Sequence, residues 1–295
     1  MKQSRFAGSL MLLLAALIWG TAFVAQRVGM DFAGPLTFNG VRSLIGAAVL
    51  VPLFLLLKPK ENVNYRKTAL GGLLCGLLIF AATNLQQAGI LYTEVGKAGF
   101  ITTFYLILVP LFGLFLRRRI GPLTWVAVVL SLAGLYFLCM TPGSFSLQKG
   151  DFLVLGCAFF FAVQIMVIDH FVQDVNGIMM NSIQFGVSGL LSLLAAFVFE
   201  KPQFSLLFRE GWVPLLYTGV LSCGIAYSLQ ILGQKRLHPA VAAIMMSLES
   251  VFAVLGGWLI LHQKLSGREL LGCGLMLCAV LLVQLVPASP PKTKQ

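Results

Sequence analysis

Apolar segments long enough to cross a bilayer follow one another along almost the whole chain. A helix rises about 1.5 Å per residue, so about 20 apolar residues span the roughly 30 Å hydrocarbon layer. Only internally hydrogen-bonded helices or closed barrels can span lipid, and the alternation typical of barrel strands is absent from these segments. The sequence therefore predicts an all-α membrane protein with ten transmembrane helices. They are expected at residues 8–28, 36–57, 69–91, 98–116, 123–140, 151–168, 178–199, 211–233, 240–261 and 268–286.

The composition agrees with this reading. The 295 residues are 58% hydrophobic and only 11% charged, and the mean hydropathy is +0.91. This number of charges is too small to solvate a globular surface, and lipid must therefore cover most of the exterior. The formal charge of +11 could suggest nucleic acid, but the basic residues form short clusters between apolar segments. We expect a single transmembrane domain over residues 1–295, as a monomer or homodimer, with the lipid bilayer and no nucleic acid as a partner.

The positions of Lys and Arg predict the orientation in the membrane. If the N-terminus is cytoplasmic, 13 of the 21 basic residues fall in inner segments and 7 in outer ones, and Arg42 lies within a span. Because cytoplasmic segments are enriched in Lys and Arg, both termini are expected inside, in a multi-pass protein of the inner (cytoplasmic) membrane. Pro35, Pro122 and Pro239 stand just before apolar segments, where their missing amide hydrogen costs nothing, and they support three helix starts.

The two halves of the chain match each other at a shift of 142 to 145 residues. The clearest matches are Gly8 with Gly150, Asn39 with Asn181, Gln86 with Gln230, and Gly89 with Gly233. Since each half contains an odd number of helices, the second half must enter the membrane from the opposite side. The sequence predicts two inverted five-helix repeats, residues 6–142 and 148–288. Two inverted halves can exchange conformations and so open a central site alternately to either side.

Two charges stand inside the expected spans. Each of Arg42 and Glu249 costs about 2.5 to 3.5 kcal/mol at a helix centre on insertion scales, so each is expected to face a cavity or a partner. Glu249 lies nine residues into its segment, about 14 Å along a helix and close to mid-membrane. One interpretation makes Glu249 a proton or substrate-cation site and Arg42 an anchor for a substrate carboxylate. The other pairs the two with each other, or with backbone carbonyls, to hold the bundle together.

Neutral polar residues recur at matching positions of the two halves. A cavity between the halves, lined by segments 69–91, 98–116, 211–233 and 240–261, would collect them. The alternative is interhelical hydrogen bonding, at about 0.6 kcal/mol per contact, which does not explain the recurrence. Trp19 could face the same cavity, although Trp in a span often serves packing alone. The substrate-binding candidates are Trp19, Thr83, Gln86, Thr103, Tyr105, Tyr227, Gln230 and Ser247, with Arg42 and Glu249 as charge or coupling candidates.

Other features concern helix packing. Gly72 and Gly76, and likewise Ala253 and Gly257, have the spacing of small residues that lets two helices approach closely. Pro110 lies in the middle of segment 98–116 and is expected to kink it, which would free a carbonyl near the cavity.

Catalytic and cofactor signatures are weak. No cluster of His, Cys and Asp has the spacing of metal ligands, and the six cysteines all lie in apolar segments, so we expect neither a metal nor a cofactor. A lone Glu249 leaves no carboxylate pair for acid and base catalysis, which makes an intramembrane enzyme the weaker alternative. A passive membrane-assembly protein would not explain matched polar positions. With no nucleotide-binding motif, transport would draw on ion or solute gradients.

Three stretches of sequence resemble a known family. They are Ala15 to Gly20 (AALIWG), Gly96 to Gly113 (GKAGFITTFYLILVPLFG) and Ser247 to Ile260 (SLESVFAVLGGWLI). With the duplicated halves, they are similar to the EamA type of the drug/metabolite transporter superfamily, and the resemblance covers nearly the whole chain. It implies a central cavity, alternating access and, frequently, export of amino acids or other small metabolites from a bacterial cytoplasm. The expected function is therefore that of a secondary transporter for a small-molecule substrate.

The sequence departs from the family pattern in two places. A Pro commonly follows the Glu of the ninth helix, and here Ser250 stands instead, so a kink borrowed from relatives is not assured. The next loop commonly carries Gly-Glu and here reads Leu261, His262, Gln263, which removes a candidate carboxylate.

Overall fold

The computed structural model of the protein describes residues 2–56, 63–93, 95–118, 120–140, 148–261 and 266–284. Across these ranges the chain is helical and has no strand. Seven helices in this part are long and apolar enough to cross a membrane, and two shorter apolar helices occupy Pro122–Leu138 and Pro239–Leu255. Residues 57 and 285–286, the ends of two expected segments, and the loop residues His262 and Gln263 lie outside the described ranges.

The helices form ten membrane crossings, at the positions that the sequence predicts, so the all-α fold with ten transmembrane helices is confirmed. The first half contains α1 (Lys2–Gly29), α2 (Pro35–Leu56), α3 (Tyr65–Ile90), α4 (Val95–Thr102), α5 (Tyr105–Phe115) and α6 (Pro122–Cys139). The second half contains α7 (Lys149–Phe171), α8 (Gly177–Phe199), the short α9 (Phe204–Arg209), α10 (Trp212–Leu216), the π-helix η1 (Tyr217–Ala226), α11 (Tyr227–Gln234), α12 (Pro239–Met246), α13 (Glu249–Leu261) and α14 (Gly267–Gln284). Three crossings are composite: α4 with α5, α10 with η1 and α11, and α12 with α13.

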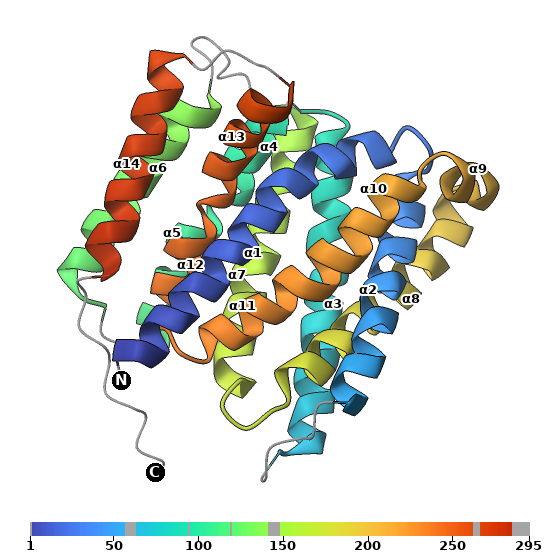
Figure 1. Ribbon diagram of the computed structural model, residues 1–295, viewed down its shortest axis with the longest axis horizontal. Coiled ribbons are helices and arrows are strands. Elements are labelled where there is room, and N and C mark those ends of the chain that lie inside the picture. The colour runs from blue at the N-terminus through green and yellow to red at the C-terminus, as the bar shows by residue number, and fades with distance from the viewer. Residues whose placement is uncertain are drawn as a thin grey trace.

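The two halves form inverted repeats, and two glycine contacts show how they fit together. A Cβ on Gly150 of α7 would lie 2.6 Å from the carbonyl oxygen of Gly89 in α3. A Cβ on Gly233 of α11 would lie 3.1 Å from the carbonyl oxygen of Gly8 in α1. Gly8 matches Gly150, and Gly89 matches Gly233, so each contact becomes the other when the halves are exchanged. After ten crossings, α14 ends at the side where α1 begins (Figure 1), and Arg5 Nη2 donates to Val283 O across 3.0 Å.

Small residues bring other helices close, as the sequence predicts. A Cβ on Gly72 would lie 2.7 Å from Ile183 Cβ, and a Cβ on Gly76 would lie 2.7 Å from Val187 Cβ, so α3 packs tightly against α8. The surroundings of the Gly257 position are not among the described side chains. At the edge of the bundle, α6 and α14 pack against each other as an outer pair (Figure 1).

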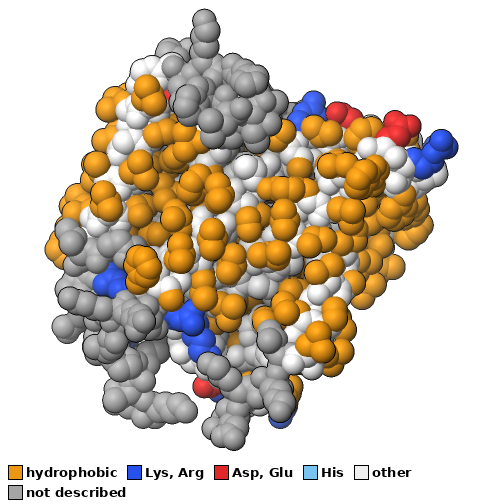
Figure 2. All heavy atoms as spheres, in the orientation of Figure 1, with side chains coloured by type: hydrophobic (Ala, Val, Ile, Leu, Met, Phe, Trp, Pro, Cys, Tyr) orange, Lys and Arg blue, Asp and Glu red, His pale blue; other side chains and the backbone are white. Residues whose placement is uncertain are grey.

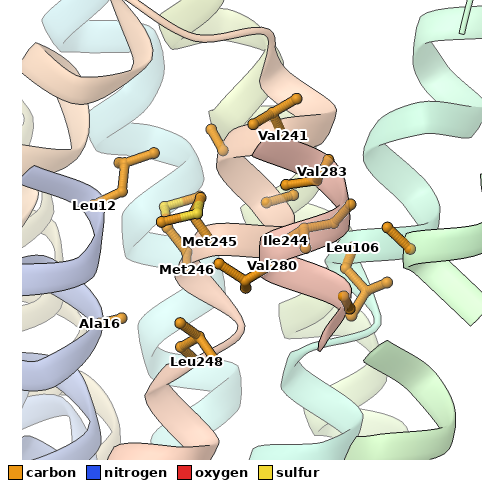
Figure 3. Close-up of a cluster of buried hydrophobic side chains, with 14 of the residues drawn as sticks. Leu12, Ala16, Leu106, Val241, Ile244, Met245, Met246, Leu248, Val280 and Val283 are labelled. Atoms are coloured by element: carbon orange, nitrogen blue, oxygen red, sulfur yellow. The ribbon is translucent and has the colours of Figure 1, made fainter. Parts of the chain in front are cut away.

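An apolar cluster fills the space around α12 (Figure 3). Leu12 and Ala16 of α1 lie on one side of it, with Leu106 of α5 and Val280 of α14 on the other. The outer surface is also apolar: hydrophobic side chains cover most of the face in Figure 2, and the charged side chains in view lie toward its upper right and lower edges. A surface of this kind suits lipid rather than water.

Candidate functional site

Two helices are interrupted at equivalent points of the two repeats. α4 and α5 are separated at residues 103–104, and α12 and α13 are separated at residues 247–248, a shift of 144. Thr103 Oγ1 donates to Gly99 O across 2.6 Å, and Ser247 Oγ donates to Ile244 O across 2.8 Å. Hydroxyls that bond back to a carbonyl of their own helix bend it. The two breaks therefore share the same kind of side-chain hydrogen bond.

These breaks differ from the predicted kink. Pro110 lies inside α5, and the interruption of this crossing comes before it, at residues 103–104. The second break exists although Ser250 replaces the Pro that relatives commonly carry. As a result Tyr105 is the first residue of α5 and Glu249 is the first residue of α13.

A cavity lies where the two breaks meet the other helices, and the space between its wall atoms, open solvent included, is about 610 Å³. Among the predicted site residues, those that line it are Trp19, Arg42, Thr83, Gln86, Tyr105, Tyr227, Gln230 and Glu249. The remaining wall residues, which the sequence analysis missed, are Phe23, Gln26, Thr102, Phe161, Gln164, Ile165, Phe185, Ser222, Cys223 and Met246.

Thr103 and Ser247, the other two candidates, do not line the cavity. Both are fully buried, and the hydroxyl of each is engaged by a carbonyl of its own helix. Their positions explain the matching between the repeats without a ligand, because they lie at the helix breaks that bring Tyr105 and Glu249 to the wall.

The cavity wall itself follows the repeat. Matching residues from the two halves face it together, which places the cavity between the repeats rather than within one of them. The matching pairs in the wall are Trp19 with Phe161, Phe23 with Ile165, Thr83 with Tyr227, Gln86 with Gln230, Thr102 with Met246, and Tyr105 with Glu249.

Glu249 carries the isolated carboxyl group of the wall. The Glu249 side chain is 6% exposed, and the hydroxyl of Tyr105 donates a long hydrogen bond of 3.5 Å to its Oε1. Within the described part of the chain it forms no ion pair with Arg42, so the mutual pairing considered from the sequence does not occur. A buried carboxylate without a cation is costly.

Gly20 lets α1 approach the backbone of Glu249. A Cβ at Gly20 would lie 2.5 Å from Glu249 O and 2.8 Å from Ala253 N. Both contacts are with backbone atoms, which cannot move aside as a flexible side chain can. The glycine of the AALIWG stretch therefore sets how deeply α1 seats against α13.

Arg42 is held on α2 by one of its nitrogens. Its Nε donates to Asn39 Oδ1 across 2.7 Å, and Asn39 Nδ2 donates to Thr83 O across 3.0 Å. The guanidinium also lies 5.7 Å from the centre of the Phe38 ring. Its two terminal nitrogens have no hydrogen-bond partner among the described residues, so the side chain presents unused donors at the cavity wall.

Aromatic rings form another part of the wall. The Tyr227 ring meets Trp19 edge to face with centroids 4.7 Å apart, and meets Phe185 in the same way at 4.8 Å. Three buried polar atoms of wall residues lack a partner in the described structure: Trp19 Nε1, Gln26 Oε1 and Gln230 Oε1. The wall thus offers unsatisfied donors and acceptors beside apolar ring surfaces. The described residues include no group of three side chains suited to a metal ion.

A ten-helix membrane protein with inverted halves around a polar central cavity has the architecture of a membrane transporter. Comparison with known proteins gives the family: the EamA-like transporter family matches residues 6–140 and again residues 148–285. The chain belongs to the EamA-like transporter family, and its general role is transport across a membrane.

Individual relatives agree along nearly the full length. A protein of Archaeoglobus fulgidus described as an uncharacterized transporter is 30% identical over 283 residues, which cover 95% of this chain and 87% of that protein. YedA of Escherichia coli K12, described as an uncharacterized inner membrane transporter, is 27% identical over 282 residues, or 93% of this chain and 90% of YedA. A solved crystal structure at 20% identity shares the fold with a TM-score of 0.80, over 95% of this chain and 96% of that one.

Proposed function

We propose that the protein is a secondary transporter that exports small polar metabolites, such as amino acids or related solutes, from the cytoplasm by alternating access. The observation that carries this proposal is the cavity between the two repeats, whose wall pairs residues of one half with matching residues of the other. A site between inverted halves can open to one side when the halves adopt one arrangement and to the other side when they exchange arrangements.

The helix breaks support the same mechanism. Both interrupted crossings lie at the cavity, and each can bend at its break, where the backbone hydrogen bonds tighten to a three-residue spacing, from Phe104 N to Ile101 O and from Leu248 N to Met245 O. We assign the repeats to residues 6–142 and 148–288, which the two stretches matched by the family support. The excess of Lys and Arg in the expected inner segments supports both termini in the cytoplasm, with the protein in the inner membrane.

Individual wall residues take separate roles in this proposal. The free terminal nitrogens of Arg42 bind an anionic group of the solute, in the bidentate way that suits a carboxylate. Glu249 binds a coupling proton or a cationic group. The rings of Trp19 and Tyr227 and the amides of Gln86 and Gln230 contact the rest of the solute, while Thr83 and Tyr105 shape the wall.

The test uses purified protein in liposomes. A thermal-shift screen against metabolites first identifies a solute that raises the melting temperature, because a ligand of the folded state stabilises it. If Glu249 carries the coupling proton, Glu249→Gln abolishes uptake driven by a pH gradient but leaves counterflow of that solute intact. Glu210→Gln, at an exposed position, serves as the control and leaves both assays unchanged.

Two results would contradict the proposal. Unchanged pH dependence in the Glu249→Gln protein removes Glu249 from the coupling role. Chemical conversion of the solute by the protein in detergent, where no gradient exists, would favour an intramembrane enzyme instead of a transporter.

A further inference from the structure

Four buried amide side chains link α11, α7 and α8 in a continuous line of hydrogen bonds. Gln230 Nε2 donates to Gln164 Oε1 across 3.2 Å, and Gln164 Nε2 donates to Gln184 Oε1 across 3.5 Å. Gln184 Nε2 then donates to Asn181 Oδ1 across 2.5 Å. All four residues are at most 3% exposed, so solvent water does not compete for these bonds.

The direction of this line is fixed at its Asn181 end. Asn181 Nδ2 donates to Cys223 O at 3.1 Å and to Gly224 O at 3.0 Å. A carbonyl oxygen can only accept, so Asn181 must place its nitrogen there and its oxygen toward Gln184. Asn181 Nδ2 also lies 2.8 Å from Ser228 Oγ. Because the Ser228 hydroxyl donates its own hydrogen to Gly224 O, its oxygen can only accept from Asn181 Nδ2.

The constraint passes from one amide to the next. Each amide has one donating nitrogen and one accepting oxygen, so each must turn its nitrogen toward Asn181 and its oxygen away from it. Aligned amides of this kind strengthen one another. The line ends at Gln230 Oε1, which has no partner among the described residues although Gln230 lines the cavity. A buried acceptor without a partner is unfavourable unless a ligand supplies the missing donor.

We propose that Gln230 Oε1 is a fixed hydrogen-bond acceptor for the transported solute, and that Gln164 is the residue that positions it. This inference rests on the proposed function, because it assigns a role within the same cavity. Without Gln164, the Gln230 amide is free to turn its nitrogen toward the solute, and the acceptor becomes a donor. With Gln164 in place, a solute must bring an N–H or O–H group to this point.

The rest of the wall indicates which probes suit the test. Arg42 presents donors that fit an anionic group, and Gln26 Oε1 is a second buried acceptor without a partner. The solute therefore combines an anionic group with a separate hydrogen-bond donor. Acids that share one carbon skeleton and differ only in an amino, hydroxy or oxo group beside the carboxylate isolate the contribution of that donor.

The experiment measures uptake of three such sets by the reconstituted full-length protein. The probes are L-alanine, L-lactate and pyruvate; L-phenylalanine, L-phenyllactate and phenylpyruvate; and L-glutamate, L-2-hydroxyglutarate and 2-oxoglutarate. For every skeleton that is transported, the amino or hydroxy acid is expected to have a KM at least about tenfold lower than the oxo acid, since an unpaired polar group in the site disfavours the analogue that lacks the donor. This comparison needs no variant and so does not depend on a mutant folding.

Variants then test the positioning residue. Gln164→Leu is expected to raise KM for the amino and hydroxy acids about tenfold with little change in kcat, and to remove the preference over oxo acids. Gln164→Glu should restore the preference, because a protonated carboxyl group both accepts and donates as the amide does. Gln234→Leu is the matched control: Gln234 is 1% exposed on α11, the helix of Gln230, and donates to Ile165 O at 3.2 Å, but it lies outside the cavity wall.

Each outcome decides the question. Transport of amino and oxo acids with equal KM, or a preference that survives Gln164→Leu, overturns the inference and leaves the proposed function standing. A loss of preference in Gln234→Leu equal to that in Gln164→Leu assigns the effect to general loosening of α11 and also overturns it. Uptake of none of the nine acids rejects the proposed function, and the inference with it.

Discussion

The two repeats place the same asparagine at the same point and then diverge three residues later. Asn39 of α2 and Asn181 of α8 match at a shift of 142. The oxygen of Asn39 accepts from Arg42 Nε across 2.7 Å, and the oxygen of Asn181 accepts from Gln184 Nε2 across 2.5 Å. Each asparagine nitrogen donates to the neighbouring helix of its own half, to Thr83 O in one case and to Cys223 O and Gly224 O in the other.

As a result of that divergence, the two halves present different hydrogen-bonding groups to the cavity. Arginine has no acceptor and keeps two terminal nitrogens free, so at this position the first half presents charged donors. Gln184, the residue that matches Arg42, orients the amide of Gln164, which in turn orients the amide of Gln230. The second half therefore presents an acceptor, Gln230 Oε1. The asparagines that hold helices together match between the copies, whereas most residues of the cavity wall differ in identity and only a few, such as Gln86 and Gln230, are the same. Under the proposed function, such a wall recognises an asymmetric solute.

The largest effect on transport is expected when Arg42 is replaced by glutamine, the residue at the matching position of the second half. Gln in place of Arg42 can still donate to Asn39, as Gln184 does to Asn181, but it removes the charged donors from the wall. We expect Arg42→Gln to lower kcat/KM for an acidic solute by about 2 kcal/mol, or roughly 30-fold, the scale of a hydrogen bond to a charged group. Thermal stability should not fall, because replacing a buried charge by a neutral group is often neutral or stabilising. Uptake in liposomes and thermal unfolding in detergent measure the two quantities.

Lys67→Gln is the control for the loss of a positive charge. Lys67 pairs with Asp174 at 2.7 Å, but both side chains are well exposed at 49% and 40%, and such pairs contribute little. Similar losses of uptake in the two variants would mean that overall charge, and not the cavity, accounts for the Arg42 effect.

A smaller effect is expected at the glycine contacts that relate the halves, and it should be unequal. A Cβ at Gly150 would meet backbone atoms, Gly89 O at 2.6 Å and the carbonyl carbon of Tyr92 at 2.9 Å. At Gly8 the nearest atom is the side-chain Cβ of Arg236 at 2.9 Å. Since the contacts at Gly150 are closer than those at Gly8, Gly150→Ala should destabilise by about 1.5 kcal/mol and Gly8→Ala by about 1 kcal/mol or less.

Unfolding titrations in mixed micelles compare these two variants. Gly274→Ala in α14 is the control, because a Cβ there would meet nothing within 4 Å. It should be neutral or stabilising by up to about 1 kcal/mol, from the better helix propensity of alanine. If Gly8→Ala proves as costly as Gly150→Ala, the two contacts between the halves are equally tight and the asymmetry inferred from the distances is wrong.

The sequence predicts the fold well because the physical constraint is strong. Lipid imposes helices of known minimum length, so the apolar windows between charged residues, Pro and Gly locate ten crossings, and an odd number per half determines the inversion. It also identifies those wall residues that are polar in both copies, such as Gln86 with Gln230 and Tyr105 with Glu249. These positions required no knowledge of helix packing.

The rest of the wall could not be predicted by that criterion. Gln164 matches Ala22 of the first half and Gln26 matches Ile168 of the second, so neither glutamine has a polar counterpart to identify it. Their signal was a single glutamine inside an apolar segment, which is equally consistent with an ordinary hydrogen bond between helices. The break at residues 103–104 carries no proline or glycine, and Pro110, where the sequence predicts a kink, lies beyond it inside α5.

The smallest effect concerns the two hydroxyls at the breaks. Thr103→Val and Ser247→Ala each remove one bond to a carbonyl of the same helix. If the hydroxyls merely accompany a break that tertiary packing imposes, each change costs about 0.5 kcal/mol, the low end for a hydrogen bond, and uptake changes by roughly twofold. We expect this outcome in both halves, because backbone bonds such as Thr103 N to Gly99 O at 3.1 Å and Ser247 N to Ala243 O at 3.0 Å remain. A loss of more than tenfold in uptake at Ser247 alone, with stability unchanged, would instead show that the second break is the one that moves, because Glu249 begins the helix that follows it.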